Sequence, residues 1–134
     1  MNSMNDYIRV PFVDRGRSWQ GADCWGLVVL FYGREFGIDL EDVSYYSNSN
    51  ALDEVSYAVG REKQNWHQVW SKSYGDVILM RVRGWPTHVG IYVGKQRVLH
   101  TQQQVGVTVE RISHLQNIEG YYRHEHLIGK AASV

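Results

Sequence analysis

The order of apolar and polar residues divides the chain into a helical first part and a strand-rich second part. Between residues 23 and 36, apolar side chains recur at helical spacing, which predicts a helix capped by Asp23 and ended by Gly37. A weaker helix is predicted over residues 51–64, and residues 1–10 are expected to form an arm or a short first helix.

The periodicity changes from helical to extended at Gly75. Strands are predicted over residues 76–82, 87–93, 97–101, 106–110 and 121–127, with a turn at Gly94-Lys95. The pattern between residues 65 and 74 indicates neither element. Helices followed by strands are typical of an α+β domain with an antiparallel sheet.

Composition narrows the class of protein. The chain has 134 residues, which fits a single domain over residues 1–134, and its 14 basic and 14 acidic residues balance. This balance argues against a nucleic-acid binder and against adsorption on an anionic membrane. The longest apolar run, residues 27–32, is too short to span a bilayer, and residues 1–9 lack the apolar core of a signal peptide. We therefore expect a protein made in the cytoplasm and not exported by the common route, with neither nucleic acid nor membrane insertion among its interactions.

Cys24 is the only cysteine, so it is either a small core residue or a reactive thiol. On position alone, a core residue of an amphipathic helix is the commoner outcome. The first turn of the predicted helix offers free backbone N–H groups and the positive end of the helix dipole, which favour an anion. There the pKa of the thiol is expected to fall, and the same N–H groups can hold an oxyanion.

Two histidines supply a candidate base and a residue to orient it. His88 lies in an apolar strand, where a lone histidine is usually a satisfied core residue, and Gly90 leaves space beside it. His100 follows twelve residues later, across the Gly94-Lys95 turn, on the adjacent predicted strand. If loop parity puts both on one face, their Cβ atoms lie ~5–8 Å apart. His100 could then orient His88 while His88 takes a proton from Cys24.

Four blocks in order resemble the NlpC-type cell-wall peptidases, which are papain-like. They are DCWGLV at residues 23–28, GDVIL at 75–79, HVGIYVG at 88–94 and VLH at 98–100. The resemblance spans roughly residues 5–125. It implies an α+β core whose nucleophile begins a helix packed on an antiparallel sheet. It also implies Cys24 as nucleophile, His88 as base, His100 as the third polar residue and no cofactor.

The chain departs from most cell-wall members beside the cysteine. Trp25 stands where most have serine, and this resembles the branch carried at the tail tip of tailed phages. Phe12 stands where many members have a tyrosine that contacts the oxyanion region, so this position lacks the hydroxyl that those members have. Asp23, Trp25 and Phe12 are therefore the expected oxyanion and substrate neighbourhood. Trp85, in a turn expected over residues 84–86 just before His88, is expected to form a wall of the site.

The resemblance implies hydrolysis of the bond from γ-D-glutamyl to a diamino acid in peptidoglycan stem peptides. Carried in a virion tail tip with other tail-tip proteins, the chain would open the host cell wall during DNA entry. The alternative is a structural tail-tip protein with weak or vestigial activity, and a housekeeping wall peptidase is disfavoured by the missing signal peptide. No metal site is expected, because His124 and His126 lack a selected third ligand and fit a solvated edge strand.

Overall fold

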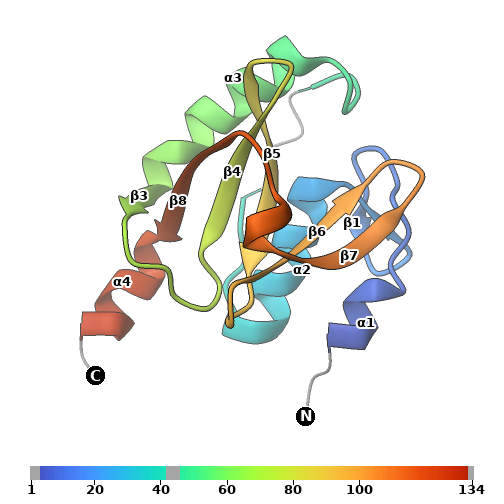
Figure 1. Ribbon diagram of the computed structural model, residues 1–134. Helices are drawn as coiled ribbons and strands as arrows, with labels where there is room; N and C mark the ends of the chain where they lie inside the picture. The colour runs from blue at the N-terminus through green and yellow to red at the C-terminus, as the bar shows by residue number, and fades with distance from the viewer. Residues whose placement is uncertain (1–3, 42–45, 133–134) are drawn as a thin grey trace.

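The computed structural model describes residues 4–41 and 46–132, and the helical part comes first (Figure 1). Its elements are α1 (Met4–Ile8), the short strands β1 (Arg17–Ser18) and β2 (Gly21–Ala22), α2 (Cys24–Phe36), α3 (Leu52–Glu62) and the 3₁₀ turn η1 (Lys63–Asn65). In the described part of the chain, no helix combines the length and apolar character needed to cross a membrane. The predicted first helix and the helix over 51–64 are both present, with slightly shorter bounds.

A six-stranded antiparallel sheet follows. Its strands are β3 (Trp66–Val69), β4 (Val77–Val82), β5 (Trp85–Tyr92), β6 (Arg97–Gln102), β7 (Gly106–Arg111) and β8 (Ile118–His124), followed by α4 (Glu125–Ala132). The 3₁₀ turn η2 (Ile112–His114) connects β7 to β8. The strand order is β3-β8-β4-β5-β6-β7, with α2 behind the sheet in Figure 1. The α+β class with an antiparallel sheet is confirmed.

Helix α2 begins and ends where the pattern predicted. The Asp23 side chain accepts a hydrogen bond from the Gly26 amide, which satisfies one of the free N–H groups of the first turn. Gly37 adopts a left-handed conformation with φ of 64° and donates its N–H to the Gly33 carbonyl. The Asp23 cap places Cys24 at the first position of the helix, and Gly37 ends the helix after Phe36.

Strand alternation assigns side chains to two faces of the sheet. The face against α2 carries Val77, Leu79, Val89, Ile91 and Leu99. The opposite face carries Ile78, Met80, Tyr92 and Val98, covered by residues of η2 and the segment after it. Each face thus has its own apolar cluster, which fixes the register of the strands that carry the two histidines.

The structure corrects the sequence expectations at the end of the chain. The last strand ends at His124, and residues 125–127 begin α4. Strand β8 lies between β3 and β4, so the solvated edge strand expected here is wrong. His124 is buried and packs edge-on against Trp66, with 4.9 Å between ring centroids. The segment without a predicted element supplies β3, which pairs with β8 through residues 66–69.

The turn before His88 is also displaced from its expected place. Arg83 and Gly84 make the turn, both with positive φ, and Trp85 is already the first residue of β5. Trp85 pairs with Val82 on β4. The expectation that residues 84–86 form the turn was wrong, because the strand extends to the tip of the β4–β5 hairpin.

Candidate active site

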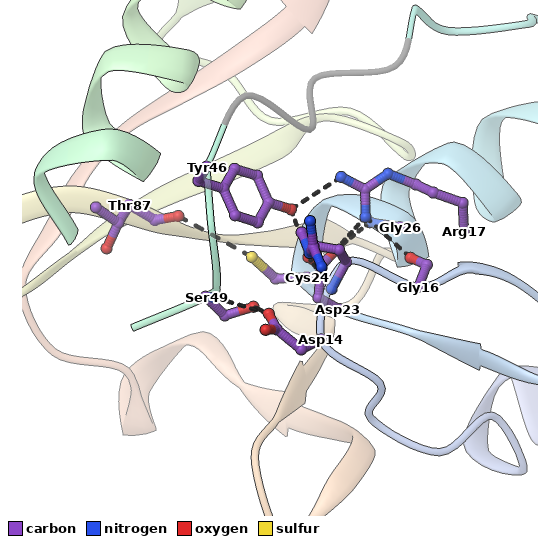
Figure 2. Close-up of polar contacts among 10 residues, drawn as sticks. Asp14, Gly16, Arg17, Asp23, Cys24, Gly26, Tyr46, Ser49 and Thr87 are labelled. Atoms are coloured by element: carbon purple, nitrogen blue, oxygen red, sulfur yellow. Dashed lines mark hydrogen bonds and ion pairs between the residues drawn. The ribbon is translucent and has the colours of Figure 1, made fainter. Parts of the chain in front are cut away.

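Cys24 lies against the backbone of β5 on both sides of His88. Its Sγ is 4.0 Å from the Thr87 carbonyl oxygen (Figure 2), and the Val89 amide also interacts with the sulfur. Strands β5 and β6 pair at Ile91 with Leu99 and at Tyr92 with Val98. The pairing with β6 thus covers only the end of β5, and Cys24 lies against the edge of β5 before Ile91. Cys24 and Thr87 are 63 positions apart in the chain.

The two histidine rings meet directly. Nε2 of His88 is 2.9 Å from Nδ1 of His100, and the ring centroids are 5.2 Å apart. The parity that the sequence left open therefore puts both side chains on one face. A Cβ on Gly90 would lie 2.7 Å from Cγ1 of Val98 and 3.1 Å from Cβ of His100. Gly90 is thus needed for β6 to bring His100 this close to β5.

Two cavities flank Cys24. The larger, about 250 Å³, is lined by Phe12, Asp23, Cys24, Thr87, His88 and several polar residues from positions 49–50 and 101–103. The smaller, about 60 Å³, is almost wholly apolar and contains Trp25 and Cys24 in its wall. Phe12 and Asp23 thus lie beside the thiol, and Trp25 lies on its apolar side. Trp85 is exposed and lines neither cavity.

The protonation of the cysteine differs from the sequence expectation. Burial, followed by the nearby Asp23 carboxylate, raises the pKa of Cys24 to about 12 despite the helix start. Burial, with a smaller contribution from His100, lowers the pKa of His88 to about 4. At neutral pH the site therefore holds a thiol and a neutral imidazole rather than an ion pair. The expected fall in the thiol pKa was wrong, because the partly buried thiol is desolvated and lies beside the Asp23 carboxylate.

This protonation predicts slow alkylation of Cys24. Because the thiolate is the reactive species, iodoacetamide should modify Cys24 at pH 7 at least ~10-fold more slowly than free cysteine. The rate should rise about tenfold per pH unit between pH 7 and 9 without levelling off. Intact-protein mass spectrometry measures it, free cysteine in the same buffers is the control, and a rate that is flat above pH 6 would contradict the raised pKa.

Asp23 anchors the start of α2 to two other segments. Its Oδ1 lies 2.8 Å from Nη1 of Arg17, its Oδ2 accepts from the Arg15 amide at 3.1 Å, and the Tyr46 hydroxyl donates to it (Figure 2). Tyr46 is buried and lines both cavities at Cys24. A tyrosine hydroxyl therefore does stand at the first turn of α2 even though Phe12 has none.

Sequence reasoning did not assign a role to Arg17, Tyr46 or Glu110, all of which contact the site. Tyr46 lies in an irregular polar segment where no periodicity marks a residue as buried. Glu110 ends up beside His100, at 3.4 Å, only through the β6–β7 pairing. Among the described residues, no group of three or more His, Cys, Asp or Glu side chains is arranged to hold a metal ion.

Comparison with known proteins adds family membership to this geometry. Residues 9–128 match the sequence model of the NlpC/P60 family, about nine-tenths of the chain. The chain belongs to the NlpC/P60 family. The match includes Cys24, His88, His100 and all six strands of the sheet.

A curated relative from Escherichia coli K12 is named murein DD-endopeptidase MepS/murein LD-carboxypeptidase. It is 26% identical over 113 residues, which cover 84% of this chain and 53% of the relative. The same protein from Escherichia coli O157:H7 matches equally. The chain thus spans about half the length of the curated relatives it matches.

Solved NlpC/P60 structures share the fold. The NlpC/p60 domain of the peptidoglycan hydrolase SagA superposes with a TM-score of 0.60 at 20% identity, covering 88% of this chain and 89% of that domain. An NlpC/P60 family protein from Bacillus cereus gives a TM-score of 0.66 at 19% identity over 92% of this chain and 40% of its own. The papain-like NlpC/P60 fold is therefore confirmed.

Proposed function

We propose that the chain is a cysteine peptidase that hydrolyses an amide bond in peptidoglycan stem peptides. Cys24 is the nucleophile, His88 the base and His100 the residue that orients the base. The observation that carries the proposal is the position of the Cys24 sulfur, against the backbone on both sides of His88 and open to a 250 Å³ cavity. The relatives named as murein endopeptidase and peptidoglycan hydrolase support peptidoglycan as the substrate.

The protonation state determines the order of events. The neutral His88 imidazole takes the Cys24 proton as Sγ attacks the carbonyl carbon, because neither group is charged beforehand. The Gly26 amide is already bound to Asp23 and the Trp25 amide interacts with the Cys24 sulfur, which leaves the Cys24 amide to hold the oxyanion. Protonated His88 then gives its proton to the leaving amine. Water, activated by His88, hydrolyses the thioester to a carboxylate.

Digestion of purified peptidoglycan tests the proposal. The protein should release soluble fragments and create one new amino group and one new carboxyl group for each bond cut, with fragment masses that identify the bond. Glycan strands stripped of stem peptides should remain intact and control for a contaminating glycosidase. After acid quenching, any thioester on the protein must be at Cys24, because the chain has no other cysteine. Intact stem peptides after prolonged incubation would refute the proposal.

We further propose that the bond cut joins γ-D-glutamyl to a diamino acid and that the chain acts from a virion tail tip. Trp25 supports the tail-tip placement through its resemblance to the phage branch, and it packs on Trp66 at 6.2 Å between ring centroids. The exposed side chains of Tyr57, Trp70 and Trp85 offer apolar contacts to neighbouring tail proteins. Mass spectrometry of purified phage particles encoded by the genome that carries this sequence should detect the chain. Its absence from those particles would contradict the tail-tip location.

A second candidate is a structural tail-tip protein whose hydrolase activity is weak. It is favoured by the Asp23 carboxylate beside the partly buried Cys24 thiol, which raises the pKa of that thiol. In that case the chain would be found in purified particles, and turnover on stem peptides would be far below the ordinary range of 1–10³ s⁻¹. A phage carrying Cys24→Ala would then assemble and infect normally. A peptidase needed for entry would instead give normal particles that fail to cross an intact wall.

A further inference from the structure

The side of His100 that faces away from His88 points toward a carboxylate. His100 is 2% exposed, and its Nε2 is 3.4 Å from Oε1 of Glu110 on β7. That distance is slightly longer than an ordinary N–H···O bond, and among the described residues Nε2 has no closer hydrogen-bond partner. Because an unsatisfied buried N–H is unfavourable, the partly exposed Glu110 is the group positioned to accept from it.

The β6–β7 pairing explains the approach. His100 is directly opposite Thr108, so Glu110 is the diagonal neighbour two residues along β7 and on the same face. Side chains in this diagonal relation are close enough for a long side chain to reach across. The contact is therefore built into the register of the sheet.

The two contacts of His100 together select a tautomer. A neutral imidazole has one N–H donor and one acceptor nitrogen. If Nε2 of His100 carries the proton and donates to Glu110, its Nδ1 must accept from Nε2 of His88. His88 then carries its proton on Nε2, so its Nδ1 is the basic nitrogen.

The opposite tautomer would disable the base. With the proton on Nδ1, His100 would donate to His88, and its bare Nε2 would face the Glu110 carboxylate, two acceptors against each other. The proton of His88 would then sit on Nδ1, which would leave that nitrogen without a lone pair to accept the proton of Cys24.

We propose that Glu110 is a positioning residue, which holds His100 as the Nε2–H tautomer and thereby keeps Nδ1 of His88 unprotonated. Only the use of that nitrogen as the base for Cys24 rests on the proposed function. When His88 takes the proton, the Glu110 charge also stabilises the cation through His100, although its partial exposure to water weakens this effect.

Nitrogen NMR of the histidine side chains tests the proposal without any assay. In protein labelled with ¹⁵N-histidine at pH 7, both His88 and His100 should show protonated Nε2, with signals assigned through His100→Gln. Glu110→Gln keeps an acceptor oxygen and should leave both tautomers unchanged. Glu110→Leu removes the acceptor and should shift both histidines toward protonated Nδ1. Glu119→Leu, a glutamate whose partner is the surface residue Arg81, is the matched control and should change neither.

Stem-peptide kinetics supply the second readout. Glu110→Leu should lower kcat by about tenfold or more with little change in KM, whereas Glu110→Gln should stay within about threefold of wild type. Unchanged histidine tautomers in folded Glu110→Leu would overturn the proposal, whatever the activity. If that variant does not fold, Glu110→Thr removes the carboxylate with a residue that suits a strand. Tautomers that shift as expected in a protein without peptidase activity would support the inference and refute only the proposed function.

Discussion

Replacing Cys24 by alanine, or His88 by glutamine, should each lower kcat/KM on stem peptides by about a thousandfold or more. Without the sulfur no acyl-enzyme forms, and without the imidazole the thiol proton has no acceptor. The effect should be large for both because the thiol has a pKa of about 12, so His88 must deprotonate it during attack. An ion pair formed beforehand would make the cysteine less dependent on its base.

The double variant distinguishes a joint role from two separate ones. When two residues act in the same chemical step, removing either one already abolishes that step. Cys24→Ala combined with His88→Gln should therefore have no lower activity than either single variant. His126→Gln changes an exposed histidine on α4 and should retain full activity. Release of fragments by Cys24→Ala at more than a few per cent of the wild-type rate would exclude the proposed nucleophile. Equal thermal unfolding temperatures for the variants and the wild type would show that the loss of activity comes from the missing catalytic groups and not from unfolding.

Replacing Asp23 by alanine should lower the free energy of unfolding by about 3–5 kcal/mol. The carboxylate is 2% exposed, and its removal takes the ion-pair partner from Arg17 and the acceptor from the Tyr46 hydroxyl. It also removes the cap of α2, which alone contributes about 1 kcal/mol. The start of the helix that carries the thiol would lose its attachment to both neighbouring segments.

Urea unfolding followed by circular dichroism measures the change. Asp23→Asn keeps the capping oxygen and the side-chain volume, so it should lose less than Asp23→Ala. Asp39→Ala removes an exposed carboxylate and should stay within about 0.5 kcal/mol of wild type. A loss below 1 kcal/mol for Asp23→Ala would mean that the contacts of this carboxylate contribute little to the folded state.

The elements that the sequence predicted well are those with a local cause. Asp23 and Gly37 mark the ends of α2 through capping rules that involve only neighbouring residues. The last strand was predicted over residues 121–127, three residues beyond the observed end of β8 at His124, because His124 and His126 alternate as in a strand. The chain instead turns into α4 after His124, which packs against Trp66, a tertiary contact that no local pattern reveals.

The residues of the candidate site likewise fall into those that a local sequence pattern marks and those that only the folded structure reveals. Cys24, His88 and His100 could be selected from the sequence, because a thiol at a helix start and a spaced pair of histidines are local patterns, and the structure brings the two histidine rings together. Tyr46 and Glu110 were not, since each reaches its partner only through tertiary packing or strand register. The direction of the Cys24 pKa was also missed, because the sequence shows the helix start but not the desolvation of the thiol in the folded chain.

The 63-residue separation between Cys24 and Thr87 has a consequence for synthesis on the ribosome. A nascent chain exposes its thiol long before the β4–β5 hairpin and His100 have been translated. Loops of this length close late in folding, because distant contacts form only after local ones. The nascent domain therefore has no base beside its thiol, and competence for amide hydrolysis arises only when the hairpin docks on α2. A cell that makes this protein would be protected during translation by the order of the chain itself.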